Sequence, residues 1–417
     1  MPGSWVRGAD GSGFGIENLP YGVVRRPGEG ARVAVRIGDY ALDLAAVADA
    51  GMLQAPAPGV FMQPALNAFL ELGQDAWTRT RARLTELLSS GNDEIRGSAG
   101  LAQRALIPLD RCECLLPVAV ADYVDFFSSI EHASNAGRIF RPDAEPLGPN
   151  WRWLPVGYHG RAATVVVSGT PIRRPCGQRA PEHADSPPTF GPERRLDVEV
   201  ELGFVTGPGP DPAAPIPTAA AAEVIFGFVL VNDWSAREIQ RWESQPLGPF
   251  LGKSFATSIA PWIVPLEAVQ RLRVPGVDQS PPPLEHLRVA EPWALDIDLE
   301  LAIEAAQTGV ETTISRMNSR GLYWNAAQQL AHATSGGAGV RAGDLYASGT
   351  ISGPDRGSLG CLLELSWGGR DAIALADGSE RTFLEDGDTV VIRGVGERDG
   401  ARVSFGEVRG LVQPARG

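Results

Sequence analysis

Short runs of apolar residues, alternating or continuous, predict that much of this chain folds as β-strands. Near the N-terminus, Tyr21–Arg25 and Ala31–Ile37 flank a glycine-containing turn at Gly28–Gly30. Apolar and β-branched runs bounded by glycine are typical of paired strands. Residues 61–106 instead carry apolar side chains at three- and four-residue spacing, which predicts helices. We therefore expect a first domain over residues 1–117, a small SH3-like β-barrel with appended helices.

The remaining residues, 118–417, contain many strand-like segments separated by Pro- and Gly-rich stretches. Predicted strands and helices do not alternate regularly, which argues against a doubly wound parallel sheet. We expect a mainly β (α+β) domain with a large, mostly antiparallel sheet and short helices at its rim. Strands are expected over 163–167, 196–205, 225–231, 294–305, 362–367 and 389–394, and helices over 125–136, 219–224, 235–242 and 323–333.

Charge and composition narrow the possible partners and location. The chain of 417 residues has 37 basic and 50 acidic side chains and a net charge of −13, which disfavours binding to a phosphate backbone. The best apolar stretch, 219–231, is too short to cross a bilayer and contains Glu223. Residues 1–18 show no apolar core of a signal peptide. Four scattered cysteines suit a reduced, cytoplasmic protein, with no nucleic-acid or membrane partner expected.

Lys253 is the single lysine of the chain, because the other 36 basic residues are arginine. Lysine supplies a compact ammonium group with three donors and a tunable pKa, which arginine does not. The residue lies in an apolar segment punctuated by glycine, and not in a polar loop. This setting favours a functional role over a chance survivor at the surface.

Acidic residues alternate with apolar ones between Leu196 and Leu202, at Asp197, Glu199 and Glu201. In one strand the three carboxylates would share a face. A solvated outer face tolerates their mutual repulsion. A bound Mg²⁺ or Ca²⁺ would stabilise them further, since both ions prefer oxygen ligands. Either interpretation fits the pattern.

Asp233 ends a near-continuous apolar run that begins at Gly227. The run predicts a buried strand, with Asp233 at its C-terminal end and a helix immediately after it that Ser235 would cap. Because strand ends commonly carry binding groups, Asp233 is either a second metal-ligating carboxylate or a capping residue.

A candidate general base, His132, lies in the predicted helix 125–136. There Asp125 and His132 stand two turns apart on one face. A histidine in polar surroundings titrates close to neutral pH and can activate water. His159, between two glycines, is another candidate base. No G-x-S-x-G motif or cysteine–histidine motif is present, so an activated water fits better than covalent catalysis.

Taken together, these motifs resemble the fumarylacetoacetase (fumarylacetoacetate hydrolase) family over nearly the whole chain. The tyrosine-containing G-Y-H-G-R segment is among the more specific matches. The matching segments are residues 18–23, 123–129, 150–151, 154–161, 167–172, 232–237, 249–255 and 347–354.

The resemblance implies a large mixed β-sheet of the fumarylacetoacetase type, a homodimer, and a bound Mg²⁺ and/or Ca²⁺. It also implies a reaction, the cleavage of a carbon–carbon bond in a β-diketo acid by water to give fumarate and acetoacetate in tyrosine and phenylalanine breakdown. By matched position, the residues fall into four groups. These are Asp125, Glu199, Glu201, Asp233, Lys253 and Thr257 around the cation; His132 as base with Glu364 orienting it; Arg237, Gln240 and Lys253 as oxyanion donors; and Arg141, Tyr158, Gln240 and Thr350 as substrate contacts.

Two positions depart from the family pattern. Phe127 and Ser244 stand where the family usually has tyrosines at the substrate pocket, so two phenolic hydroxyls are missing. These changes leave one alternative open, and a second, from a different class of protein, stands independently of them. One is an acylpyruvate hydrolase or 2-oxo acid decarboxylase of the same superfamily, and the other is a non-catalytic cation-binding scaffold.

Overall fold

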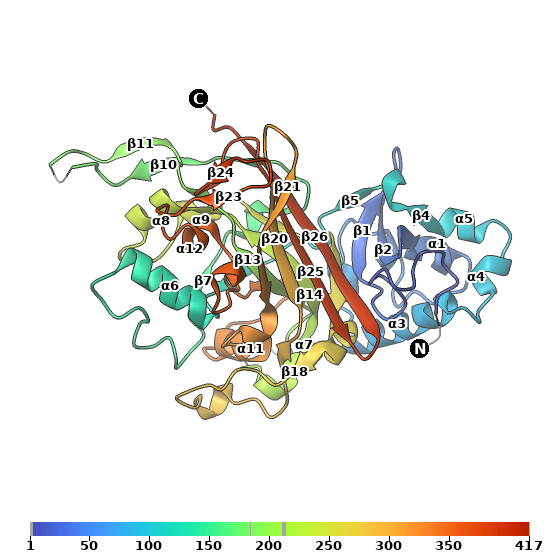
Figure 1. Ribbon diagram of the computed structural model, residues 1–417. Coiled ribbons are helices and arrows are strands. Elements are labelled where there is room, and N and C mark those ends of the chain that lie inside the picture. Colours follow the sequence, from blue (N-terminus) through green and yellow to red (C-terminus); the bar gives the residue numbers. More distant parts are fainter. Residues whose placement is uncertain (1–2, 184, 211–213, 417) are drawn as a thin grey trace.

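A computed structural model describes residues 3–183, 185–210 and 214–416. The N-terminal part, blue to cyan in Figure 1, lies on one side of the molecule beside the long strands β25 (Thr389–Arg398) and β26 (Ala401–Gln413). Helices α6, α8, α9 and α12 gather on the opposite side, where the hairpin of β10 and β11 also projects. The predicted mixed, mostly antiparallel β architecture with rim helices is confirmed.

The largest sheet joins the N-terminal part to the rest of the chain. Within the described residues it has 13 strands, ordered β4-β3-β2-β1-β17-β14-β13-β22-β6-β7, with β5, β8 and β16 paired at its sides. Their bounds are β1 Tyr21–Arg25, β2 Ala31–Ile37, β3 Tyr40–Asp43, β4 Leu106–Pro108, β5 Glu113–Leu115, β6 Tyr123–Phe126, β7 Gly157–His159, β8 Val165–Val167, β13 Val200–Thr206, β14 Ile225–Asp233, β16 Thr257–Ile259, β17 Trp262–Pro265 and β22 Leu345–Ala347.

A second sheet and several short pairs complete the β-structure. Its five strands follow the order β21-β20-β25-β26-β9, with β9 Ile172–Arg173, β20 Asp298–Glu304 and β21 Glu311–Asn318. The two-stranded pairs are β10 Cys176–Arg179 with β11 Thr189–Pro192, β12 Leu196–Asp197 with β15 Ser235–Ala236, β18 Arg273–Val274 with β19 Ala294–Leu295, and β23 Ile373–Ala374 with β24 Glu380–Arg381.

The α-helices are short and lie at the margins of the sheets. Residues 61–106, predicted as helical, contain four of them. The helices are α1 Leu44–Asp49, α2 Asn67–Leu70, α3 Gln74–Leu88, α4 Glu94–Gly97, α5 Leu101–Ala105, α6 Ile130–Phe140, α7 Ala221–Val224, α8 Arg237–Glu243, α9 Leu251–Ser254, α10 Leu266–Val269, α11 Ala326–Thr334 and α12 Leu362–Leu365.

Strand β14 lies at the centre of the hydrophobic core, and every one of its residues is buried. A strand covered on both faces has no need for alternating polar positions, which explains its continuous apolar sequence. It pairs with β13, β16 and β17. Asp233, the last residue of β14, is thereby held rigidly inside the protein.

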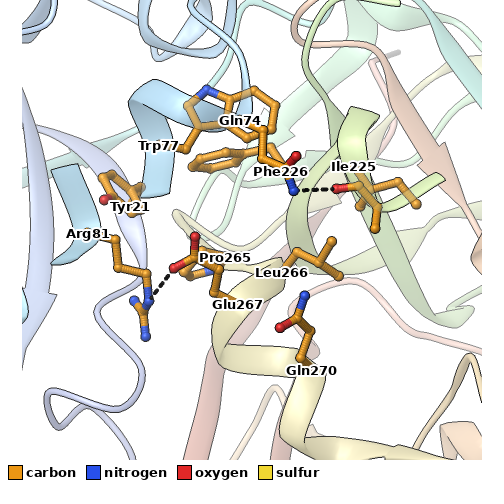
Figure 2. Close-up of a pocket in the computed structure, with 11 residues that line it drawn as sticks. Tyr21, Gln74, Trp77, Arg81, Ile225, Phe226, Pro265, Leu266, Glu267 and Gln270 are labelled. Atoms are coloured by element: carbon orange, nitrogen blue, oxygen red, sulfur yellow. Dashed lines mark hydrogen bonds and ion pairs between the residues drawn. The ribbon is translucent and has the colours of Figure 1, made fainter. Parts of the chain in front are cut away.

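Side-chain packing also ties the N-terminal part to the central strand. Figure 2 shows Trp77 of α3 beside Phe226 of β14, with ring centroids 5.1 Å apart in an edge-to-face arrangement. In the same view Arg81 forms an ion pair with Glu267 at 3.3 Å. Because strand β1 pairs directly with β17, the contact between the two parts combines backbone hydrogen bonds with apolar packing.

The predicted helix over 125–136 is wrong in its first part. Residues 123–126 form strand β6, which pairs in parallel with β22, and α6 begins only at Ile130. Ser129 is the N-cap of α6, and its hydroxyl accepts a hydrogen bond from the backbone N–H of His132 at 3.3 Å. Asp125 and His132 thus lie on different elements and not on one helical face.

The predicted strand over 196–205 is interrupted. Strand β12 ends at Asp197, and β13 begins at Val200 in a different sheet. Between them Glu199 forms an isolated bridge with Cys361. The predicted strand 362–367 is likewise wrong, because residues Leu362–Leu365 form helix α12.

Two smaller predictions also fail. The first half of the predicted strand 163–167 is a 3-10 helix, Ala162–Thr164, and only β8 is extended. Ser235 does not cap α8. It lies in strand β15, its hydroxyl donates to the backbone carbonyl of Asp233 at 3.1 Å, and the N-cap residue is Ala236.

Within the described ranges, no helix has the length and apolar character needed to cross a bilayer.

Candidate active site

One cavity of about 580 Å³ collects most of the residues that the sequence singled out. It lies between β6, α6, β7, α8 and α9. Glu201, Asp233, Thr257 and Glu364 do not line it but lie directly behind residues that do. The predicted residues on its wall are Asp125, Phe127, His132, Arg141, Tyr158, Glu199, Arg237, Gln240, Ser244, Lys253 and Thr350.

Four buried carboxylates meet at and directly behind the wall of this cavity. Asp125 comes from β6, Glu201 from β13 and Asp233 from the end of β14, while Glu199 lies in the break between β12 and β13. One oxygen of each lies within 4.8 Å of the others. All four are nearly inaccessible to solvent, so a solvated outer face does not explain the acidic alternation.

Lys253 and two hydroxyl groups hold Asp233 in place. The Lys253 ammonium donates to Asp233 Oδ2 at 2.7 Å and also donates to Glu199. The Tyr158 hydroxyl donates to the same Oδ2 at 2.9 Å, and Thr257 donates to Oδ1 at 3.0 Å. The single lysine of the chain therefore contacts two members of the carboxylate cluster.

The charges around the cluster do not balance. Burial would raise the pKa of Glu199, but the nearby charges of Lys253 and Arg237 outweigh it and hold that pKa low. For Glu201, burial and then the charges of Asp125 and Asp233 raise the pKa well above its usual value. Burial and the charge of Asp233 do the same for Asp125. The cluster thus contains more negative charge than its own cations neutralise.

The cluster also has acceptors without donors. Asp125 Oδ1 and Glu201 Oε1 are buried and accept no hydrogen bond from any described residue. A buried unpaired oxygen costs about 1–3 kcal/mol. A divalent cation with oxygen ligands would satisfy both atoms and the excess charge, so the residues present fit a hard cation such as Mg²⁺ or Ca²⁺.

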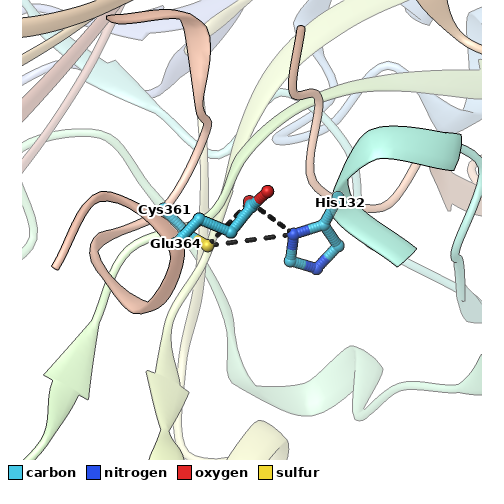
Figure 3. Close-up of side chains that lie close together, drawn as sticks. All are labelled: His132, Cys361 and Glu364. Atoms are coloured by element: carbon cyan, nitrogen blue, oxygen red, sulfur yellow. Dashed lines mark hydrogen bonds and ion pairs between the residues drawn. The ribbon is translucent and has the colours of Figure 1, made fainter. Parts of the chain in front are cut away.

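His132 forms the second functional feature of the cavity. Its Nδ1 lies 2.6 Å from Glu364 Oε2, although 232 residues separate the two in the chain. Figure 3 shows the second ring nitrogen directed away from Glu364. With Glu364 ionised, Nδ1 is the donor, and Nε2 keeps its lone pair for a proton.

Glu364 itself is held by three further donors. Ser352 Oγ donates to Oε2 at 2.7 Å, Asn135 Nδ2 donates to Oε1 at 2.9 Å, and the Cys361 thiol lies 3.1 Å from Oε2. Burial would raise the pKa of Glu364, yet the charge of His132 and these hydrogen bonds hold it below its usual value. The sequence analysis missed all three donors, and their spacing in the chain carries no signal for this contact.

Asp197 has a supporting place outside the carboxylate cluster. Its two carboxylate oxygens accept from the backbone N–H groups of Leu362 and Leu363, at 2.7 and 2.9 Å, at the N-terminus of α12. Oδ2 also accepts from Arg237 Nε at 2.8 Å. A carboxylate in this position stabilises the start of a helix, which explains why the segment around Glu364 is helical and not extended.

Arg237 and Gln240 lie together on α8, as their three-residue spacing predicts. The Arg237 guanidinium forms an ion pair with Glu199 at 2.8 Å and donates a hydrogen bond to Gln240 Oε1 at 3.2 Å. Its remaining terminal nitrogen, Nη2, is buried and has no acceptor among the described residues. Thr350 Oγ1 is in the same situation. Both polar atoms are therefore available to a bound molecule.

The two positions that lack tyrosine differ in their surroundings. The Phe127 ring packs edge-to-face on the imidazole of His132, with centroids 5.2 Å apart. The Ser244 hydroxyl donates to the backbone carbonyl of Gln240 at the end of α8. Arg141 lies in an exposed part of the cavity wall and donates to the backbone carbonyl of Pro146 at 3.2 Å.

Family models match both parts of the chain and identify it as a hydrolase. Residues 17–117 match the model described as Fumarylacetoacetase N-terminal, and residues 123–412 match Fumarylacetoacetate (FAA) hydrolase C-terminal. The chain belongs to the fumarylacetoacetate hydrolase family, as its motifs predicted.

Curated relatives cover the whole length. The chain is 48% identical to fumarylacetoacetase of Rattus norvegicus and 46% identical to that of Homo sapiens, over 99% of each chain. It is 47% identical to the enzyme of Oryza sativa subsp. japonica, over 99% of this chain and 97% of that protein. Among solved structures, the fold is similar to a fumarylacetoacetate hydrolase from psychrophilic Exiguobacterium antarcticum. That match has a TM-score of 0.53 and 16% identity, covering 95% of this chain and all of that one.

Proposed function

We propose that this protein hydrolyses 4-fumarylacetoacetate to fumarate and acetoacetate, the last step of tyrosine and phenylalanine breakdown. One observation carries the proposal. A histidine oriented by a buried carboxylate, with Nδ1 of His132 2.6 Å from Glu364, shares a cavity with four clustered carboxylates. The curated relatives with this name support the choice of substrate.

His132 acts as the general base. Nε2 takes a proton from water, and the hydroxide oxygen forms a bond to one carbonyl carbon of the diketone. The carbon–carbon bond then breaks, and its electron pair leaves as the enolate of acetoacetate. The enolate carbon that took part in the broken bond is finally protonated, and the imidazolium of His132 returns this proton. Glu364 stabilises the positive charge on His132 between these two transfers.

Asp125, Glu199, Glu201 and Asp233 would hold the divalent cation, Mg²⁺ or Ca²⁺. When bound, the cation supplies Lewis acidity to the diketone oxygens. Lys253 and Thr257 contribute by fixing Asp233, as their hydrogen bonds indicate. Because an ammonium group cannot donate a lone pair, Lys253 is a donor to the carboxylates and to the substrate and not a metal ligand.

The remaining cavity residues bind the substrate. Arg237, Gln240 and Lys253 donate to the oxyanion that develops on the attacked carbonyl. Loss of one such donor typically costs about 10²–10³ in rate. Arg141 suits a terminal carboxylate of the substrate. Tyr158 and Thr350 supply hydroxyl groups, and Phe127 and Ser244 form another part of the cavity wall.

We also propose that the protein acts as a homodimer in the cytoplasm. All four cysteines are free, which suits a reducing compartment. Sedimentation velocity over a range of protein concentrations tests the dimer, and a species of monomer mass throughout would contradict it.

The decisive experiment incubates the purified protein with fumarylacetoacetate and Mg²⁺ or Ca²⁺, and separately with a chelator, while NMR follows the products. Equal amounts of fumarate and acetoacetate, lost with the chelator, are the expected result. Folded, metal-loaded protein that leaves the substrate intact would overturn the proposal. Acylpyruvates and other 2,4-dioxo acids would then be tested, since Phe127 and Ser244 alter the pocket.

A further inference from the structure

A second cavity, of about 650 Å³, adjoins the catalytic one, and its lining includes seven arginines but only two carboxylates among the described residues. It is lined by residues of α6 and α8, by the end of β10 and the residues that follow it, by Arg194 and Arg195 after β11, and by the segment after α12. Glu182 and Glu238 are the two carboxylates on its wall among the described residues. The arginines that define this arginine cavity are Arg138, Arg179, Arg194, Arg195, Arg241 and Arg370.

Most of these guanidinium groups have no anionic partner. Arg194 pairs with Glu238 at 2.8 Å and reaches Glu182 at 3.8 Å, so both carboxylates of the cavity already serve one arginine. The other five arginines have no carboxylate within 4.0 Å in the described part of the chain. Arg138 and Arg370, for example, donate to a side-chain amide and a backbone carbonyl, which are neutral.

The arginine cavity and the catalytic cavity share part of their walls. Phe140, Arg237 and Arg241 line both. Arg237 and Arg241 of helix α8 thus lie between the catalytic cavity and the arginine cavity. Arg138 and Arg370 line the arginine cavity alone.

The positive charge of the arginine cavity is significant because the protein as a whole is negatively charged. A β-diketo diacid has two ionised carboxylates at neutral pH, and a chain of net charge −13 repels it. Unpaired guanidinium groups bind carboxylates through two parallel hydrogen bonds, and a cavity with low-dielectric walls concentrates their field. The positively charged arginine cavity offsets that repulsion next to the catalytic cavity.

We propose that the arginine cavity is a binding site for small dicarboxylate anions that captures the diacid substrate beside the catalytic cavity. The identity of the substrate in this statement rests on the proposed function. Capture raises the local concentration of the dianion, and therefore kcat/KM, without contributing to the bond-breaking step. Its effect should be greatest when little salt screens the charges.

The test compares two double variants of equal charge change. Arg179→Gln/Arg370→Gln neutralises two arginines that line the arginine cavity and not the catalytic one. Arg138 is kept, because it donates to Asn135, which in turn donates to Glu364. The control, Arg79→Gln/Arg104→Gln, neutralises two exposed arginines of the N-terminal part that have no carboxylate partner among the described residues. Steady-state kinetics are measured at ionic strengths of about 0.01 and 1 M, where the screening length changes roughly tenfold.

At low ionic strength, kcat/KM of the first variant should be about 5- to 10-fold below that of the wild type, with kcat unchanged. At high salt the two proteins should have equal kcat/KM. The control should match the wild type at both ionic strengths. Equal kcat/KM and equal salt dependence in the two double variants would overturn the proposal.

A binding measurement separates this inference from the proposed reaction. Calorimetric titration with succinate, an unreactive dicarboxylate, should give an affinity at least fivefold weaker for Arg179→Gln/Arg370→Gln than for the wild type or the control. Titration with sodium chloride at matched ionic strength corrects for screening. If the wild type fails to cleave fumarylacetoacetate but this difference in affinity persists, only the proposed reaction is wrong. Equal succinate affinities overturn the arginine cavity as a site.

Discussion

Two groups of buried carboxylates lie next to each other in this protein, joined through the bridge between Glu199 and Cys361. Glu364 accepts from four donors, and the balance of its surroundings lowers its pKa. The cluster around Asp125 and Glu201 has buried oxygens without donors, and its surroundings raise both pKa values. Similar burial therefore leads to opposite electrostatic results.

The difference separates a carboxylate whose charge is fully satisfied within the protein, Glu364, from a cluster whose charge is not. The Glu364 carboxylate needs nothing more to remain ionised, so it can orient His132 permanently. The cluster has more charge and more acceptors than the protein satisfies, which is the condition under which a cation binds tightly. A change to one of these two sites should therefore leave the other intact.

Replacing the base should have the largest effect. His132→Ala removes the group that takes the proton from water, and general base catalysis contributes about 10²–10⁴ in rate. Turnover of fumarylacetoacetate should fall by that factor, while calorimetric titration shows unchanged Mg²⁺ or Ca²⁺ binding. Turnover within a few-fold of the wild type would remove His132 as base, and circular dichroism checks that the variant folds.

Removing the cation should abolish most turnover and also change stability. A ligand at 100 times its Kd stabilises the folded state by about 2.7 kcal/mol, so the midpoint of thermal unfolding should drop by a few degrees with chelator. Addition of excess Mg²⁺ or Ca²⁺ should restore both. A chelated protein with full activity and an unchanged midpoint would mean that the four carboxylates hold no functional ion.

The size of this stabilisation should depend on pH. Without the cation, Asp125 and Glu201 have raised pKa values in the folded protein, so their contribution to stability is present at low pH and is lost as pH rises through those values. A bound cation replaces the protons. The gain in the unfolding midpoint from the cation should therefore be larger at pH 8 than at pH 6, and a larger gain at pH 6 would contradict this assignment.

Loss of a single donor to Glu364 should have a moderate effect. Ser352→Ala removes the hydroxyl that donates at 2.7 Å, and a hydrogen bond to a charged group is worth about 1.5–3 kcal/mol. We expect kcat to fall roughly tenfold, with KM unchanged, because the loss loosens the orientation of His132. Ser366→Ala is the matched control, since Ser366 is equally buried next to α12 but accepts from Gly369 instead. Equal kcat values for the two variants would show that Ser352 has only a packing role.

Restoring a hydroxyl in the pocket should have the smallest effect. Phe127→Tyr adds a donor beside His132, and a neutral hydrogen bond is worth about 0.5–1.5 kcal/mol. KM for fumarylacetoacetate should decrease about two- to tenfold with little change in kcat. Phe190→Tyr, on the exposed hairpin strand β11, controls for the chemical change alone. A KM that rises would indicate that Phe127 is adapted to a different substrate.

The acidic alternation singled out three carboxylates, of which the structure brings two into one cluster. Glu199 and Glu201 lie in it, whereas Asp197 contacts α12 and Arg237 because the strand ends at that residue. Periodicity cannot show where a strand ends when backbone groups of a distant segment supply the reason. The same limit explains α12, whose first N–H groups donate to Asp197 across 165 residues of chain.

Asp125 and His132 were singled out together for a reason that the structure contradicts. The prediction placed them on one helix, whereas β6 and α6 bring them to one cavity from separate elements. No sequence pattern assigned Asn135, Ser352 or Cys361 to Glu364, because a donor to a buried carboxylate differs from any other polar residue only through tertiary contacts. Strong local patterns, such as the strand over Ala31–Ile37, were recovered in full.

The pairing of β1 with β17 has a consequence for the order in which this protein is made. Tyr21 and Gly22 leave the ribosome early, but their hydrogen-bonding partners Ile263 and Trp262 follow only after more than half of the chain. Strand β5 covers the same edge of β1 over Val23–Arg25, so the part that stays open is the end at Tyr21 and Gly22. At about 5–20 residues per second, this end remains unpaired for roughly ten seconds to most of a minute. During synthesis that edge is a place for unwanted strand pairing, so chaperone demand should concentrate on nascent chains that end before β17.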